Sequence, residues 1–282
     1  MKNLNDPFYR HSGQFGPVGM MMMLGLGASA GIISGAIYGA LIYWSPIIYL
    51  NLVGTIGVGF AAGGAVYLGA TVGKVRSPIF CGLGGVIAGC AALWAAWVGW
   101  IYAYSAHGET AVILLRPGYI WNTMVAVGRE GIWGFVSSDP VKGLELYGIW
   151  IAEAVTIVGG AAFMAYLMVS GKPFCERCSR WVSNKTKLPE LCPPRNEHVL
   201  DGLLTGDVSG ILTLGRGRDG GMHIQVEVRG CGTCDEMYIA NISVVAESTD
   251  KKGKTETKTT HLVKNLRLSA ADYQALHGFK GV

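Results

Sequence analysis

Four long apolar runs dominate the first 170 residues of the chain. Residues 18–44, 47–73 and 79–104 carry no charged side chain, and residues 148–170 carry only Glu153. A helix over residues 18–44 would be about 40 Å long, enough to cross a hydrocarbon core of about 30 Å. Because a backbone amide in lipid must find its hydrogen-bond partner within the segment, we predict four membrane-spanning helices over these ranges.

The segments around these runs are more polar. Residues 1–17 contain two prolines and two glycines and are expected to be a polar lead-in. Ala28-Ser29-Ala30 resembles a signal-peptidase site, but the apolar run continues to Trp44, so we predict an uncleaved first helix. Residues 105–147 form an outer loop, in which Arg116-Pro117 opens a short amphipathic helix on the membrane surface. A cap over a small ligand is the alternative interpretation of that loop.

A different pattern begins at Gly171 and runs to the end of the chain. Residues 198–204 and 207–214 are typical of short helices, and residues 222–229 alternate between polar and apolar side chains as a strand does. Two more strands are predicted over 237–247 and 255–266, followed by a helix over 270–276 that Ser269 would cap. Residues 171–282 are therefore predicted to be a small α+β domain with a three-stranded antiparallel sheet.

Charge supports the division into two parts. Only 15% of the 282 residues are charged, whereas soluble domains have about a quarter. The first 171 residues hold 7 basic and 6 acidic side chains, so lipid is expected around the first part and water around the second. The net charge of +4 is mild, and we do not expect a nucleic-acid partner.

The basic residues predict the orientation in the membrane. Four spans place nine of them on one side, which should be the cytoplasm, together with both termini, whereas the outer loop holds three basic residues against four acidic ones. The aromatic residues agree, because they gather near the opposite, outer ends of the runs, as in an interfacial belt. The nine basic residues are Lys2, Arg10, Lys74, Arg76, Lys172, Arg177, Arg180, Lys185 and Lys187, and the belt comprises Tyr43, Trp44, Tyr49, Trp94, Trp97, Trp100, Tyr102, Tyr104, Tyr147 and Trp150.

Glycines recur every fourth residue in the apolar runs and so form stripes along the predicted helices. Such stripes let helix backbones approach closely in lipid. They could line a pore or join two copies of the chain as a homo-oligomer. We favour packing within one chain, because the first three runs contain no ionisable side chain that could line a path. The stripes are Gly27, Gly31, Gly35 and Gly39, then Gly59 and Gly63, Gly69 and Gly73, and Gly85 and Gly89.

Glu153 is the one acidic residue within an apolar run, and such a carboxylate is a functional candidate. It lies only five residues from the predicted outer end of its helix, where water can reach it. A structural role is therefore favoured, in which Glu153 accepts from a backbone amide or pairs with Arg116, Arg129 or Lys142. A proton or ion site is the alternative.

Two Cys-x-x-Cys pairs stand in the polar third of the chain. Cys175 and Cys178 follow the fourth run at once, and Cys231 and Cys234 come after an interval of 52 residues. Zinc takes four ligands in a tetrahedron, and each pair can supply two thiolates. Because the cytoplasm disfavours disulfides, we predict one structural Zn²⁺ on these four cysteines, with an insertion between the pairs.

Two alternatives to this site involve other uses of the cysteines. Cys175, Cys178, Cys192 and His198 could form a local site with three cysteines and one histidine. Cys231-Gly232-Thr233-Cys234 could instead belong to a redox protein, but such motifs begin a helix, and here strands are predicted on both sides. The whole fold class is then a membrane all-α four-helix bundle followed by a small α+β zinc-ribbon-like domain.

The order of these features resembles a group of uncharacterised bacterial four-pass membrane proteins that end in a zinc-ribbon-like domain. Three motifs carry the resemblance: Lys74-Val75-Arg76, Gly148-Ile149-Trp150-Ile151-Ala152-Glu153 and Pro173-Phe174-Cys175-Glu176-Arg177-Cys178. The resemblance implies the four-cysteine site and a cytoplasmic ribbon in a multi-pass protein of the bacterial inner membrane. It implies no activity.

No catalytic motif accompanies these features, so we do not predict an enzyme. Residues 215–220 are rich in glycine, but they lack the Lys-Ser/Thr end and the strand–loop–helix setting of a phosphate loop. We predict a membrane-anchored adaptor or sensor that contacts lipid and a cytoplasmic protein. The second hypothesis is a small channel or transporter with a regulatory ribbon, and the third is a cysteine redox protein.

Overall fold

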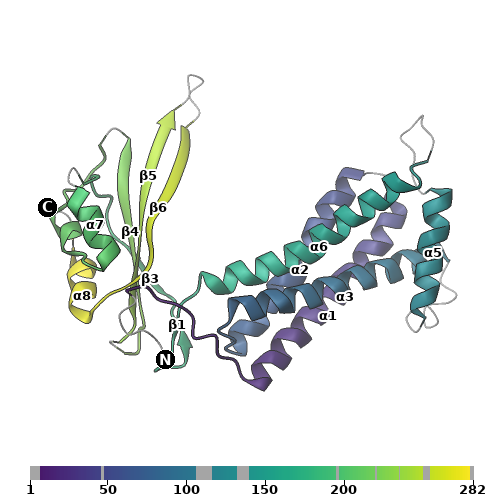
Figure 1. Cartoon of the computed structure of the whole chain (residues 1–282), viewed down its shortest axis with the longest axis horizontal. Coiled ribbons are helices and arrows are strands. Elements are labelled where there is room, and N and C mark those ends of the chain that lie inside the picture. Colours follow the sequence, from purple (N-terminus) through teal and green to yellow (C-terminus); the bar gives the residue numbers. More distant parts are fainter. Residues whose placement is uncertain are drawn as a thin grey trace. The chain divides into compact units, whose positions relative to one another are not determined.

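The computed structural model of the chain describes residues 7–45, 48–105, 116–131, 140–194, 197–219, 221–234, 236–249 and 255–279. These residues form two compact units, drawn as ribbons in Figure 1. The helical unit runs from Ser12 to Gly171, and the C-terminal unit starts at Lys172 and also includes residues 7–11. Four membrane-length helices followed by a sheet domain with a cysteine cluster confirm the predicted fold class.

The four long helices are α1, α2, α3 and α6, and each is long and apolar enough to cross a membrane. Helix α6 begins four residues before the predicted position 148. Leu146 in its first turn is fully buried, so this turn belongs to the bundle although it carries Glu145. The bounds are Pro17–Trp44 for α1, Ile48–Val72 for α2, Pro78–Tyr104 for α3 and Leu144–Ser170 for α6.

Helix α1 contacts α2 and α3, helix α6 contacts the same two helices, and α2 and α3 also contact each other. Glycine makes the α1–α3 contact close. A Cβ atom on Gly35 would lie 2.1 Å from the carbonyl oxygen of Ala92, and one on Gly39 would lie 1.8 Å from that of Ala96. The stripe on α1 is therefore filled by another helix of the same chain, the arrangement that the sequence analysis favoured.

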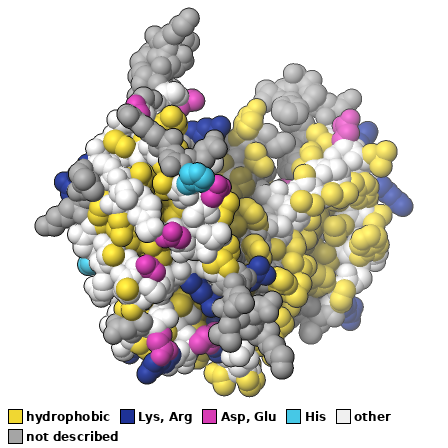
Figure 2. Space-filling view, turned by 60° about the vertical axis from the view of Figure 1, so that its left-hand side comes forward, with side chains coloured by type: hydrophobic (Ala, Val, Ile, Leu, Met, Phe, Trp, Pro, Cys, Tyr) yellow, Lys and Arg dark blue, Asp and Glu magenta, His cyan; other side chains and the backbone are white. Residues whose placement is uncertain are grey.

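The outward faces of the helices are apolar. Val18, Ile37, Leu52 and Val155 are more than half exposed in the isolated chain. Figure 2 shows hydrophobic side chains spread over the visible surface of the helical unit. An apolar surface of this kind on a bundle of membrane-length helices is the surface expected to face lipid.

Helix α5, Pro117–Glu130, is the short helix predicted for the loop between α3 and α6. In Figure 1 it runs across the bundle helices rather than along them. Ile120 is buried against the end of α3, where it packs with Val98 and Ile101, while Trp121 is 65% exposed. One apolar face thus contacts the bundle, and a bulky aromatic residue points away from it.

The sheet of the C-terminal unit has four antiparallel strands in the order β3-β4-β5-β6, so the predicted number of three is wrong. The additional strand β3 has the sequence Asn-Lys-Thr-Lys and pairs with β4 from Asn184↔Gly230 to Lys187↔Glu227. It has no apolar alternation because it is an edge strand with mostly exposed side chains. The bounds are Asn184–Lys187, Met222–Gly230, Tyr238–Thr249 and Thr255–Arg267.

The core of this unit lies between the sheet and three short helical segments. Ile224, Val226 and Val228 of β4 are buried in it, together with Ile242 of β5 and Leu276 of α8. Ser269 caps α8 as predicted, and its side chain and that of Asp272 form a reciprocal capping box. The segments are α7 (Glu197–Thr205), the 3₁₀ helix η1 (Ser209–Thr213) and α8 (Ala270–Gly278).

Residues 7–11 add to the free edge of β6. Phe8 bridges Leu266, the Tyr9 amide donates to the Asn265 carbonyl at 2.7 Å, and the Arg267 amide donates to Pro7. The Tyr9 hydroxyl accepts a hydrogen bond from the Phe174 amide at 3.0 Å. Part of the segment that was expected to be a polar lead-in is thus a component of the C-terminal fold.

Candidate functional site

Four cysteine sulfurs meet at one end of the C-terminal sheet. Cys175, Cys178, Cys231 and Cys234 each offer a sulfur, and all four sulfurs lie within 4.8 Å of one another. The Cys175 and Cys234 sulfurs are 3.6 Å apart. A tetrahedral site with metal–sulfur bonds of about 2.3 Å has its sulfurs about 3.8 Å apart, so the cluster has the size of a metal site.

Two tight turns bring the sulfurs together. The first lies in the hairpin between β1 (Phe174–Cys175) and β2 (Arg180–Trp181), where Ser179 adopts the left-handed φ of 48° that reverses the chain. The second joins β4 to β5, and the Cys231 amide closes it on the Met237 carbonyl at 3.0 Å. A Cβ on Gly232 would lie 2.6 Å from the Asn184 side chain, so glycine lets this turn approach β3.

The environment of the thiols suits a cation. Burial opposes ionisation of Cys231, but hydrogen bonds from the Thr233 amide, the Cys175 thiol and the Cys234 amide outweigh it and lower its pKa to about 7. The neighbouring Cys234 sulfur and then burial raise the pKa of Cys178 to about 12. Four thiolates at this distance repel one another unless a cation sits among them. The donor set therefore fits a metal ion.

The structure thus brings together the four cysteines that the sequence analysis selected, and they could hold a metal ion. Cys192 lies elsewhere, with its sulfur donating to the Arg216 carbonyl at 3.5 Å, and His198 is on α7. Neither belongs to the cluster. The second Cys-x-x-Cys pair stands between the strands β4 and β5. A thioredoxin-like redox motif would instead stand at the start of a helix.

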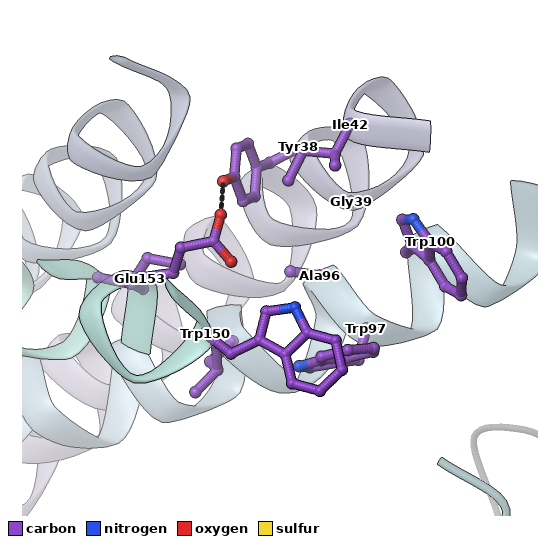
Figure 3. A pocket seen from close by; sticks show the side chains of 10 residues that line it. Tyr38, Gly39, Ile42, Ala96, Trp97, Trp100, Trp150 and Glu153 are labelled. Carbon is purple, nitrogen blue, oxygen red and sulfur yellow. Dashed lines mark hydrogen bonds between the residues drawn. The ribbon is translucent and has the colours of Figure 1, made fainter. Parts of the chain in front are cut away.

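A second candidate site surrounds Glu153 inside the helical unit. The Tyr38 hydroxyl of α1 lies 3.0 Å from Glu153 Oε1 and 3.2 Å from the carbonyl oxygen of Asn51 on α2. A cavity of about 40 Å³ adjoins the carboxylate. Figure 3 shows Glu153 and Tyr38 pointing toward each other at one side of it. Its lining consists of Tyr38, Gly39, Ile42, Leu93, Ala96, Trp97, Trp100, Trp150, Glu153 and Ile157.

Sequence reasoning missed most of this cavity. Because α6 starts at Leu144, Glu153 lies about 14 Å from the helix start at 1.5 Å per residue, deeper than expected. Trp100 and Trp150, which were assigned to the interfacial belt, are only 8% and 9% exposed and face the bundle. One signal was present in the sequence: Trp150 and Glu153 are three residues apart and therefore share a helix face.

The basic residues considered as partners for Glu153 do not pair with it. Arg116, Arg129 and Lys142 belong to the described residues, and none of them forms an ion pair with this carboxylate. Its partner is a tyrosine from another helix. Sequence offered no hint of that contact, because Tyr38 and Glu153 are 115 residues apart and belong to no shared motif.

No protein family, curated protein or solved structure matches the chain. The two sites are therefore interpreted from their own chemistry. Four protein sulfurs around one metal leave no position for a substrate, which is typical of structural and not catalytic metal sites. The Glu153 cavity combines one carboxylate with aromatic walls, the composition of a ligand-binding pocket.

Proposed function

We propose that the chain is a membrane-anchored adaptor or sensor whose C-terminal domain holds one structural zinc ion and contacts a cytoplasmic protein. The observation that carries this proposal is the convergence of four cysteine sulfurs within 4.8 Å in a domain joined directly to a bundle of four membrane-length helices. The domain has a core of its own, which supports a role of the helices as its anchor.

Zinc is the metal that best fits the four sulfurs. Tetrahedral sets of four thiolates hold zinc or iron, and zinc is the usual structural ion with two Cys-x-x-Cys turns. The ion would join residues that are far apart in the chain, since 52 residues separate the two pairs. Because such a site does not exist in the unfolded chain, the free energy of metal binding would contribute to folding.

We propose that the adaptor domain lies on the cytoplasmic side of a bacterial inner membrane. Free thiols persist in the reducing cytoplasm, and the basic residues flanking the helices favour the same side. Residues 7–11 pair with β6, so the chain enters α1 and leaves α6 from the same side of the membrane. The even number of candidate spans among the described residues, four, agrees with this topology.

The outer edge of β6 is the surface that we assign to the protein partner. β6 is the last strand of the sheet, and residues 256–261 along it are exposed. Phe8 of the chain itself bridges the same edge at Leu266, which supports the proposal that this edge pairs with another segment. Exposed strand edges bind extended segments of other proteins through main-chain hydrogen bonds.

The test uses full-length protein solubilised from its own membrane, because an isolated fragment 171–282 would lack Phe8 and Tyr9. Proteins that co-purify with it are quantified by mass spectrometry. Wild type is compared with C175S/C178S, which loses two metal ligands, and with C192S as the matched cysteine control. We expect a partner that is retained by wild type and C192S and lost from C175S/C178S.

A second pair of variants tests the assigned surface. T257K/T259K adds charge to the exposed part of the β6 edge, a substitution that blunts strand pairing. Q274K adds the same charge to the exposed surface of α8. The partner should be lost from T257K/T259K and retained by Q274K. If wild type retains no protein beyond those bound by C175S/C178S, the adaptor function is wrong.

A further inference from the structure

The Glu153 carboxylate has little within the protein to compensate its charge. Among the described residues its only hydrogen-bond partner is Tyr38, at 3.0 Å. The Tyr38 hydroxyl carries a single proton and has a second acceptor, the Asn51 carbonyl, at 3.2 Å. None of the four spanning segments contains a lysine or an arginine. A carboxylate in an apolar bundle must therefore be neutralised by a proton or by a cation from outside the chain.

Aromatic rings form much of the wall beside this carboxylate. The Trp97 and Trp150 rings are 4.9 Å apart with an interplanar angle of 85°, and those of Trp97 and Trp100 are 6.1 Å apart at 68°. Figure 3 shows the Trp97 and Trp150 indoles across the cavity from Tyr38. These three indoles line one cavity, and the face of tryptophan attracts cations most strongly among the aromatic side chains.

The lining also determines which kind of cation fits. Metal cations such as Ca²⁺ and Mg²⁺ require about six oxygen ligands, and here the carboxylate of Glu153 and the hydroxyl of Tyr38 are the only side-chain oxygens in the lining. A quaternary ammonium ion needs no such ligands and is recognised by aromatic rings. The cavity of about 40 Å³ has room for a few water-sized groups, so the cation must be compact.

We infer that the cavity between Tyr38, Trp97, Trp150 and Glu153 binds a small organic monocation of the quaternary ammonium class. Glu153 supplies the counter-charge, Tyr38 holds the carboxylate in place, and the indoles contact the methyl groups of the cation. This inference is independent of the zinc domain, and it concerns binding alone.

The experiment titrates full-length protein in detergent with tetramethylammonium and follows indole fluorescence and calorimetric heat. The neutral molecule tert-butanol, which has the same number of heavy atoms, tests the need for charge. We expect saturable binding of tetramethylammonium and none of tert-butanol. E153Q should weaken binding by about tenfold or more, because it removes the ion pair in a poorly hydrated site.

Two variants separate binding from folding. E153D keeps the carboxylate and should retain tighter binding than E153Q. E145Q removes an exposed carboxylate of α6 that does not line the cavity, and it should bind as wild type does. The inference is wrong if wild type shows no saturable binding or responds equally to tert-butanol. It is also wrong if E153Q binds like wild type, or if E153D and E145Q lose as much affinity as E153Q.

Discussion

Arg218 connects two carboxylates on the surface of the C-terminal domain. Its Nε and Nη2 atoms donate to the two oxygens of Glu190 at 2.5 and 2.7 Å, and its Nη1 donates to Glu247 of β5. In the sequence, Arg218 stands within a glycine-rich segment, residues 215–220. In the fold it ties the segment after β3 to β5, and paired hydrogen bonds of this kind are among the stronger ones.

The Arg218 contacts predict a pH-dependent contribution to stability. Hydrogen bonds from Arg218 lower the pKa of Glu190 below its ordinary value of 4.5. A carboxyl whose pKa is lowered by folding stabilises the fold above its ordinary pKa and loses this effect as the pH falls through the folded value. R218Q should therefore lower the melting temperature at pH 7, and the difference from wild type should shrink below pH 4.5.

K258Q is the control for R218Q, since Lys258 is an exposed residue of β6 that forms none of these contacts. Its melting temperature should follow wild type at every pH. If the melting temperature of R218Q stays below that of wild type by the same amount from pH 7 to pH 3, the contact between Arg218 and the ionised Glu190 does not contribute to stability.

Single residues differ in how well the sequence reveals their role. Cys175, Cys178, Cys231 and Cys234 could be selected in advance, because ligand spacing within each pair is a local property. Tyr38 could not, since its role depends on the rotation of α1 relative to α6. A hydrogen bond between two helices that are far apart in the chain produces no repeating pattern of residues from which it could be predicted.

At the scale of elements, the α1–α3 contact depends on glycine. Gly39 faces the Ala96 backbone so closely that an added Cβ would overlap its carbonyl oxygen. G39A should separate the two helices and cost about 1–3 kcal/mol of bundle stability, the usual range for overpacking. The unfolding midpoint in mixed detergent–SDS micelles, followed by circular dichroism, measures this loss.

Gly25 provides the matched control on the same helix, because nothing lies within 4 Å of a Cβ placed there. G25A should be neutral or stabilising by up to about 1 kcal/mol, since alanine is the better helix former. Equal effects of G39A and G25A would show that the α1–α3 packing is not as close as described.

Element boundaries were predictable where apolar runs were long. The helices α1, α2 and α3 each begin and end within one residue of the predicted bounds, because membrane length and the flanking breaks leave little freedom. β3 was missed because its side chains are polar and exposed. The predicted helix over 207–214 is a five-residue 3₁₀ segment, in which Ile211 is buried.

At the scale of the whole molecule, residues 7–11 and the described residues after Gly171 belong to one unit. Residues 7–11 belong to the same unit as β6, with Phe8 bridging Leu266, as expected if the segments before α1 and after α6 lie on one side of the membrane. This link could not be predicted from the sequence, because Phe8 and Leu266 lie near opposite ends of the chain. The residues around each of them form no motif that indicates the other as a partner. The basic residues predicted the same topology from an independent principle.

Reporter fusions test this topology. Green fluorescent protein, which fluoresces only when it folds in the cytoplasm, should be fluorescent at either end of the chain. Alkaline phosphatase, active only outside, should be active when inserted between α3 and α5 and inactive at the C-terminus. Phosphatase activity at the C-terminus would place the cysteine domain outside and contradict the proposed cytoplasmic location.

The metal content of the purified full-length protein tests the central claim most directly. Elemental analysis should find one zinc ion per chain in wild type and in C192S, and almost none in C175S or C234S. The C-terminal domain of these two variants should also be digested faster by protease, because the ion stabilises its fold. Wild-type protein that has no bound metal, four freely reactive thiols and an intact C-terminal domain would contradict the account. Bound iron would confirm a metal site at the four cysteines and would show that zinc is the wrong ion.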